Sequence, residues 1–224
     1  MKILLAVILS LISFSSWGLS IPQLTGPVVD QAKLFSSLQK SNLEKEIRLF
    51  RENNGPHLQV LTINSLEDEI LEDYTIEVVE EWKIGDEEKD DGLLIFLSKN
   101  DRKVRIEVGD GLEGIITDYR SSQIIELMLP YFKQGAFAAG ITAGTMTIMK
   151  LIRGENPDLP KGKKEKENPI TTLIFFLFVI FFGAFGKRRR GYLSGYSSFG
   201  SSGSSSSWGG GGGSFSGGGS SGSW

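Results

Sequence analysis

The chain of 224 residues contains no cysteine and only one histidine, His57. The lack of cysteine excludes disulfide bonds, a thiol nucleophile and thiolate metal sites. A single histidine excludes a zinc site built from several imidazoles and leaves little room for a Ser-His-Asp triad. The formal net charge of −3 is too small to favour a nucleic-acid partner through bulk electrostatics.

Common catalytic motifs are also missing from the region that is expected to fold. It contains no Gly-x-Ser-x-Gly sequence and no phosphate-binding P-loop. Gly109, Gly111 and Gly114 match a dinucleotide-binding pattern only in number, because they follow an antiparallel strand rather than the first strand of a βαβ unit. His57 stands at the start of a predicted strand, where a structural role is favoured over a catalytic one.

Apolar and polar segments divide the chain. Residues 1–20 combine a basic start, a short apolar run and small residues, which predicts a secretory signal peptide cleaved after Ser20, with an uncleaved anchor as the alternative. Residues 156–169 are a polar linker. Residues 170–186 carry no charge and would extend roughly 25 Å as a helix, which predicts a transmembrane helix rather than a buried core helix.

The last segment, residues 187–224, begins with basic residues and is then almost entirely Gly and Ser with scattered aromatic residues. This composition predicts a disordered tail, with weak multivalent contacts through the aromatic residues as the alternative. The signal peptide would carry the folded region across the membrane, and the span would then leave the tail in the cytoplasm. The expected protein is therefore a single-pass protein of the cell membrane with an extracytoplasmic domain.

The folded region, residues 21–155, shows helical and strand patterns in alternation. Ser36 and Gln39 form a capping box ahead of an apolar helical stripe that ends near Asn53. Further helices are predicted at about 74–82, 117–131 and 137–152, and strands at 57–63, 93–97 and 103–108. The predicted fold class is α/β, a small mixed β-sheet sandwiched between helices in the order αβαββαα.

Two successive strands form the centre of this region. Residues 93–97 are continuously apolar, as in a strand buried on both faces. Residues 103–108 alternate, so that Lys103, Arg105 and Glu107 are expected on a solvated face. The short polar turn between the two strands predicts an antiparallel hairpin.

Acidic residues stand at both open ends of this hairpin, which lie at one edge of the sheet. Asp90 and Asp91 precede the first strand, and Asp110 and Glu113 follow the second. Carboxylate oxygens are the ligands of hard cations, so these residues predict a Ca²⁺ or Mg²⁺ site. The alternative is that they cap turns, and their spacing is not that of an EF-hand.

Several motifs in this region resemble the TPM domain. They are Trp82-Lys-Ile-Gly85, Lys89-Asp-Asp-Gly92, and Asp101 to Gly109 followed by Gly111-Leu-Glu-Gly114, while Leu24-Thr-Gly26, Val28-Val-Asp30 and Leu34-Phe-Ser36 resemble its start. The resemblance covers residues 24–155. Asp110 departs from it, because relatives often carry an aromatic residue there.

The resemblance implies functions that the composition does not give. TPM relatives include plant thylakoid-lumen proteins of photosystem II repair, and some resemble divalent-cation binders, which adds Asp30 to the expected metal ligands. The implied role is a non-catalytic, cation-binding adaptor or quality-control factor for membrane-protein complexes. Some plant members resemble acid phosphatases, so a metal-dependent phosphatase acting on phosphomonoesters is the alternative, with Arg102, Arg105 and Arg120 as candidate phosphate ligands. A purely structural cell-envelope protein is the third hypothesis.

Overall fold

The structure is a computed structural model that describes residues 19–53, 55–161 and 212–224. Its elements, in order, are β1 (Val28–Asp30), α2 (Ser37–Glu52), β2 (His57–Ile63), α3 (Leu71–Glu81), β3 (Gly92–Ser98), β4 (Lys103–Val108), the 3₁₀ turn η1 (Asp110–Leu112), α4 (Asp118–Lys133), α5 (Phe137–Ile152) and β5 (Gly218–Ser223). The predicted order αβαββαα is present, with β1 before it and β5 after it.

The membrane-related predictions fall mainly on other residues. Most of the predicted signal peptide (1–20) and the whole predicted span (170–186) lie outside the described residues. Within the part of the chain that the structure describes, no helix is long and apolar enough to cross a bilayer.

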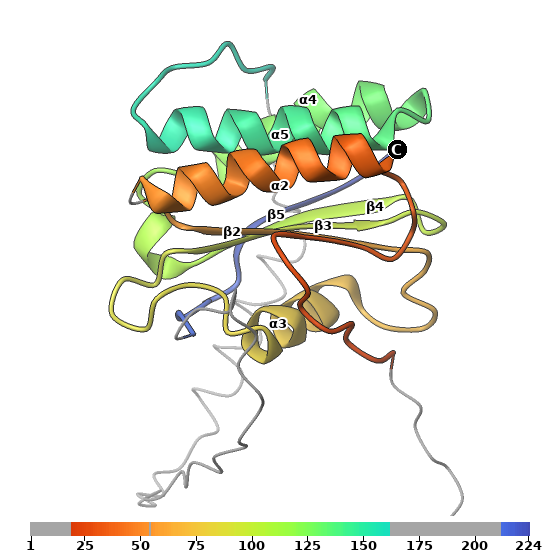
Figure 1. Cartoon of the computed structure of the whole chain (residues 1–224), viewed down its shortest axis with the longest axis horizontal. Helices are drawn as coiled ribbons and strands as arrows, with labels where there is room; N and C mark the ends of the chain where they lie inside the picture. The colour runs from red at the N-terminus through yellow and green to blue at the C-terminus, as the bar shows by residue number, and fades with distance from the viewer. Residues whose placement is uncertain (1–18, 54, 162–211) are drawn as a thin grey trace, which may run out of the picture. The chain divides into compact units, whose positions relative to one another are not determined.

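The strands form one mixed sheet in the order β1-β2-β3-β4-β5. The first three are parallel, and β4 and β5 each run antiparallel to the preceding neighbour. The predicted hairpin is confirmed, with Leu93 opposite Val108 and Leu97 opposite Val104. Helices α2, α4 and α5 cover one face of the sheet and α3 covers the other (Figure 1).

Strand β3 is buried on both faces, as its apolar run predicts. Leu93, Ile95 and Leu97 pack in the core beneath α2, α4 and α5, while Leu94 and Phe96 pack on the α3 side. Helix α2 begins at the predicted capping box, in which the Ser36 hydroxyl accepts from the Gln39 amide and the Gln39 side chain accepts from the Ser36 amide. The sandwich of a sheet between helices is therefore confirmed.

The solvated face predicted for β4 is wrong. Glu107 is fully buried and Arg105 is 7% exposed, because α3 covers this side of the strand. Arg105 forms a bidentate ion pair with Glu107, and the Thr75 hydroxyl on α3 donates to Glu107 at 2.5 Å. The two opposite charges stand two residues apart on one strand face, so each supplies the partner that the other needs in order to be buried.

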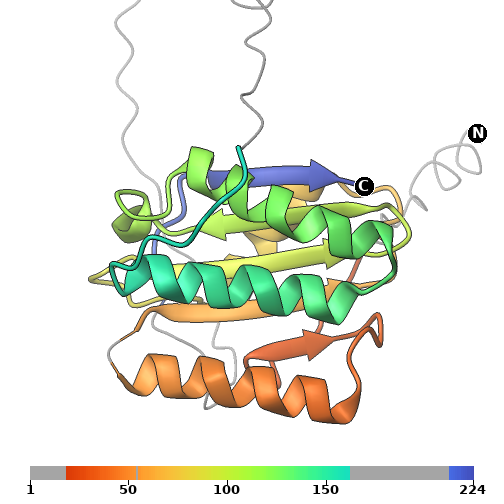
Figure 2. The same ribbon diagram turned by 90° about the horizontal axis from the view of Figure 1, so that it is seen from above.

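The prediction of a wholly disordered tail is wrong for its last residues. Gly218–Ser223 form β5, which pairs along the whole of β4 and closes that edge of the sheet (Figure 2). Composition alone treats Gly and Ser as solvated residues. Here small residues are required, because the strand lies between β4 and helix α4 with little space for side chains.

Trp82, at the C-terminal end of α3, offers a test of how the N-terminal segment is held. Its side chain is buried, and the indole N–H donates to the carbonyl of Pro22 at 2.8 Å. Trp82→Phe should lower the free energy of unfolding by about 1–2 kcal/mol, since the carbonyl loses its donor and some packing is lost. Urea denaturation measures this, with Tyr119→Phe on the exposed side of α4 as the control. Equal stability of the two variants would contradict the role of the bond.

Candidate functional site

The site lies at the sheet edge where β3 begins and β4 ends. The two strand ends meet there as predicted: the amide of Gly109 donates to the carbonyl of Gly92 at 2.8 Å, and the amide of Gly111 donates to that of Asp90 at 3.1 Å. This close approach of backbones leaves no space for a side chain at Gly111. Asp90, Asp110 and Glu113, three of the five predicted metal ligands, are thereby placed around one short stretch of the surface.

Asp30 is not part of this group. It lies at the C-terminal end of β1, opposite Thr62, whereas the group lies beside the start of β2, where His57 pairs with Gly92. Thr62 lies five residue steps along β2 from His57, which corresponds to roughly 17 Å. The Asp30 carboxylate instead accepts bonds from the Leu34 and Phe35 amides, each at 3.0 Å, and from the Thr62 hydroxyl, so it caps the turn after β1.

Asp91 is adjacent in sequence to the group but its carboxylate has another partner. Its Oδ1 accepts from the backbone amide of Asp86 at 2.9 Å, and its carbonyl accepts from the amide of His57 at 3.0 Å. Asp91 therefore supports the loop that leads into β3.

His57, whose amide bonds to Asp91, has a side chain with an altered pKa. Burial, assisted by the positive charge of Arg51, lowers the pKa of His57 to about 4, although Asp91 and Asp86 partly oppose the effect.

The three grouped carboxylates bind the chain's own C-terminal segment, residues 212–224. Asp90 Oδ1 accepts from the amide of Ser214, and Asp110 Oδ1 accepts from the amide and hydroxyl of Ser216 at 2.9 and 2.8 Å. The Ser216 hydroxyl also lies 3.5 Å from Oε1 of Glu113. The bonds from Ser216 lower the pKa of Asp110, so docking of this segment favours the ionised carboxylate.

After Ser216 the segment becomes β5, and two of its glycines are required by their positions. Gly219 has φ +126°, a conformation that side-chain-bearing residues rarely adopt. A β-carbon at Gly222 would lie 2.5 Å from Cγ2 of Ile125 on α4. Strand β5 therefore needs glycine at these two positions in order to occupy this edge of the sheet.

Aromatic side chains anchor both ends of the C-terminal segment. Phe215 packs against the core on the α3 side, over Gly92, where a β-carbon would lie 2.5 Å from the phenyl ring. Trp224 packs in a cluster with Phe132 and Phe137, at centroid distances of 4.8 and 5.8 Å. Rings of this kind contribute large apolar contact areas, so these two residues fix the position of the strand along β4.

A polar network joins the middle of β5 to the buried ion pair. The Ser221 hydroxyl accepts from Nη1 of Arg105 and donates to Oε1 of Glu72, both at 2.9 Å. Burial alone would raise the pKa of Glu72, but the bond from Ser221, together with Arg105 and Lys103 nearby, brings it below its usual value. Arg105 thus bonds both to Glu107 and to the docked strand, which its predicted solvated position did not indicate.

The sequence predicted the group of carboxylates at this edge of the sheet but not the C-terminal segment that binds to them. Two features of the sequence could have indicated that this segment forms a strand. Phe215 and Trp224 stand on either side of a run of small residues, and β4 pairs with β3 along only one of its edges, so its other edge needed a partner. Among the described residues, no three His, Asp or Glu side chains come together in an arrangement suited to a metal ion.

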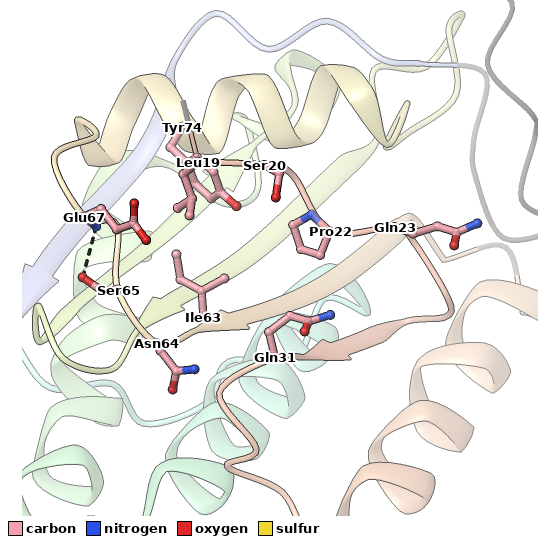
Figure 3. A pocket seen from close by; sticks show the side chains of 10 residues that line it. All are labelled: Leu19, Ser20, Pro22, Gln23, Gln31, Ile63, Asn64, Ser65, Glu67 and Tyr74. Carbon is pink, nitrogen blue, oxygen red and sulfur yellow. Dashed lines mark hydrogen bonds between the residues drawn. The ribbon is translucent and has the colours of Figure 1, made fainter. Parts of the chain in front are cut away.

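A separate hollow of about 490 Å³ lies on the α3 side, between the segment from Leu19 to Gln23 and the end of β2 (Figure 3). Glu67 is the one carboxylate among its lining residues, and its amide donates to the Ser65 hydroxyl at 3.0 Å. Tyr74 also lines it, and burial, followed by the charges of Glu77 and Glu69, raises the pKa of Tyr74 to about 12. None of the predicted site residues belongs to this hollow.

Comparison with known proteins supports the resemblance seen in the sequence. A solution NMR structure of the N-terminal domain of a P. gingivalis protein is 33% identical, with a TM-score of 0.56, and the match covers 60% of this chain and 89% of that one. The N-terminal domain of a Corynebacterium glutamicum protein matches at 14% identity and a TM-score of 0.48, over 66% of this chain and 94% of that one. No curated protein matches the chain. The family model of the TPM domain matches residues 28–151, and the chain therefore belongs to the TPM domain family.

Proposed function

We propose that this protein is a non-catalytic adaptor that binds an extended peptide strand along β4. The binding site consists of the β4 edge, the carboxylates Asp90, Asp110 and Glu113 at one end, and the Phe132–Phe137 cluster at the other. In the absence of a partner, the chain's own C-terminal segment occupies it. Addition of a strand to a sheet edge is a common mode of peptide recognition, in which backbone bonds give affinity and side-chain sites give specificity.

One observation carries this proposal: a segment far away in sequence docks through contacts of three different kinds. It pairs with every residue of β4, its serines bond to acidic residues at the sheet edge, and its aromatic residues fill apolar positions at both ends. A non-specific contact of a Gly/Ser chain would supply only the first of these. The partner we propose is therefore a protein segment with the same order of aromatic, serine and glycine residues, carried by a membrane-protein complex.

The site can be tested by replacing the docked segment with a synthetic peptide. In the full chain, Gly222→Val should release β5, because the new side chain overlaps Ile125. A labelled peptide of residues 212–224 should then bind to this variant, as measured by fluorescence anisotropy, and a peptide that itself carries Gly222→Val should bind much more weakly. Equal binding of both peptides, or no binding while the variant still melts cooperatively, would contradict the proposal.

We also propose that the domain and its C-terminal segment lie on the same, extracytoplasmic side of the membrane to which the chain is anchored. Pairing of β5 with β4 requires a shared compartment. A single crossing at residues 170–186 would separate them, so this proposal revises the expectation of a cytoplasmic tail.

Labelling of introduced cysteines tests this arrangement, since the chain has none of its own. Lys45→Cys on α2 and Ser223→Cys in β5 are both at exposed positions. In cells with an opened outer envelope and an intact cytoplasmic membrane, an impermeant maleimide should label both variants. Labelling of Lys45→Cys alone would place the tail in the cytoplasm and overturn the shared-side proposal.

Cation binding is a second proposed property of the same edge. Asp90, Asp110 and Glu113 each contact a residue in the stretch from Ser214 to Gly218, so release of that stretch would leave the three carboxylates without these contacts. Carboxylates suit Ca²⁺ or Mg²⁺. Because the same oxygens hold the serines, a bound cation would compete with the docked segment. Millimolar Ca²⁺ should then shift the amide resonances of residues 109–114 and of Ser216, and Asp110→Asn should abolish these shifts. Unchanged spectra would leave the carboxylates as turn and strand caps.

The metal-dependent phosphatase hypothesis has less support. Of its three candidate phosphate ligands, Arg105 is engaged with Glu107, and Nη1 of Arg120 donates to the carbonyl of Ile115 at 2.6 Å. Both guanidinium groups therefore already have hydrogen-bond partners within the chain. We expect no metal-dependent hydrolysis of a generic phosphomonoester by the purified chain, and turnover that is lost in Asp110→Asn would revive the hypothesis.

A further inference from the structure

The strand-binding edge carries negative charge at the end where the docked segment enters. Four carboxylates contact the segment there and form what we call the acidic end: Asp90, Asp110, Glu113 and Asp118. Besides the contacts already described, the amide of Gly219 donates to Oδ1 of Asp118 at 2.8 Å, and Oε1 of Glu113 lies against Gly218. No lysine or arginine of the described residues forms an ion pair with any of these four carboxylates.

The docked segment supplies no cation to the acidic end. Residues 212–224 contain no lysine or arginine, and the bonds to the carboxylates come from backbone amides and a serine hydroxyl. The contacts fall within residues 214–219, a stretch of roughly 17 Å at most. Four negative charges along this distance are only partly screened from one another, since the Debye length is about 8 Å at physiological salt. A positive charge on the bound strand would relieve their repulsion.

Two positions of the segment are suited to carry that charge. Ser214 and Ser216 are exposed, and they stand on either side of Phe215, which packs against the core on the α3 side. The hydroxyl of Ser216 and, more weakly, that of Ser214 lower the pKa of Asp110, so both side chains approach its carboxylate. A longer basic side chain at either position can therefore extend along the surface to a carboxylate while the aromatic residue between them keeps its place.

A partner also has to displace a segment that belongs to the same chain. A tethered segment acts at a high effective concentration, so a free partner needs contacts that the segment does not make. Charge-assisted bonds to the acidic end are contacts of this kind, and attraction between opposite charges also speeds association. An uncharged Gly/Ser segment is thus a weaker occupant of this edge than a basic strand would be.

Building on the proposed strand-binding function, we infer that the partner strand carries a basic residue on each side of an aromatic residue, in place of Ser214, Phe215 and Ser216. The aromatic ring takes the position over Gly92, and the two cations pair with the carboxylates of the acidic end. Small residues follow, because the strand then runs between β4 and α4. The site therefore selects a basic-aromatic-basic sequence at the start of a strand of small residues.

The experiment uses the full chain carrying Gly222→Val, from which β5 is released, in a buffer without divalent cations. Its probes are labelled peptides of residues 212–224 that have the native sequence, lysine in place of both Ser214 and Ser216, or glutamate in place of both. Fluorescence anisotropy should show the lysine peptide binding about tenfold more tightly than the native peptide, as expected for two surface ion pairs, and the glutamate peptide binding more weakly. The advantage of the lysine peptide should shrink in about 0.5 M salt.

Two controls assign the effect to the acidic end. A peptide with Ser223→Lys carries its cation at an exposed position opposite Lys103, so it should bind no more tightly than the native peptide. In the protein, Asp110→Asn should remove most of the advantage of the lysine peptide over the native one. Glu46→Gln, at an exposed position on α2, should leave that advantage intact.

The outcomes separate the two proposals. If the native and lysine peptides bind equally well, or if the Ser223→Lys peptide gains as much as the lysine peptide, selection of basic residues is wrong while the strand site stands. If no peptide binds to a variant that melts cooperatively, the strand site itself is wrong and the inference is lost with it. If Gly222→Val does not melt cooperatively, the substitutions at Ser214 and Ser216 are made in the otherwise unchanged chain. Lysines should then slow the hydrogen exchange of the β5 amides and glutamates should speed it, and equal exchange would overturn the inference.

Discussion

Replacing Glu107 with leucine is expected to lower the free energy of unfolding by about 3–5 kcal/mol, because it leaves the guanidinium of Arg105 buried without its charge partner. Glu107 is fully buried, and the Arg105 side chain is 9% exposed. The remaining neighbours offer little compensation, since Glu72 approaches Arg105 only to 3.7 Å and is itself half exposed. Urea denaturation of the full chain measures the loss.

Two control variants make the result specific to the buried pair. Glu107→Leu combined with Arg105→Met removes both charges and should recover most of the lost stability, because an apolar pair of similar size often replaces a buried ion pair at little cost. Glu44→Gln disrupts the partly exposed pair of Lys40 and Glu44 on α2 and should change stability by less than about 1 kcal/mol. A loss below about 1 kcal/mol in Glu107→Leu would contradict the burial of this pair.

Arg105 and Glu107 also show why part of the fold could be predicted from the sequence and part could not. Alternation correctly gave the strand, because period-two patterning reflects the pleat of the backbone, and the short polar turn correctly gave the hairpin. Alternation gave the wrong environment for Arg105 and Glu107, because a pattern of charges does not reveal that two of them neutralise each other beneath α3. That information lies in the packing of an element from another part of the chain.

The candidate site, too, could be predicted from the sequence only in part. The sequence placed Asp90 and Asp110 at one edge because an antiparallel hairpin necessarily brings its open ends together. It could not place Asp30, because the position of that residue depends on the order and direction of β1 and β2 in the sheet. It also missed β5, because composition averages over residues, whereas the fit of Gly222 against Ile125 depends on one position.

Lowering the pH from about 7 to about 4.5 should destabilise the protein by about 2 kcal/mol through His57 alone. Burial and the charge of Arg51 lower the pKa of His57 to about 4 in the folded chain, whereas a histidine in the unfolded chain titrates near 6.5. Below pH 6.5 the unfolded state therefore binds a proton that the folded state does not, and unfolding is favoured until the pH approaches 4. The stability that the neutral ring permits is thus fully present above pH 6.5 and declines below it.

His57→Gln separates this contribution from that of the carboxylates. Glutamine keeps a polar side chain at a position where Nδ1 of the imidazole is buried without a hydrogen-bond partner, but it does not titrate. Urea denaturation at the two pH values should show that the variant loses about 2 kcal/mol less than the wild-type chain on acidification. An equal loss in both proteins would mean that His57 is protonated in the folded state, and that Asp91 and Asp86 in the loop before β3 stabilise its charge as strongly as burial opposes it.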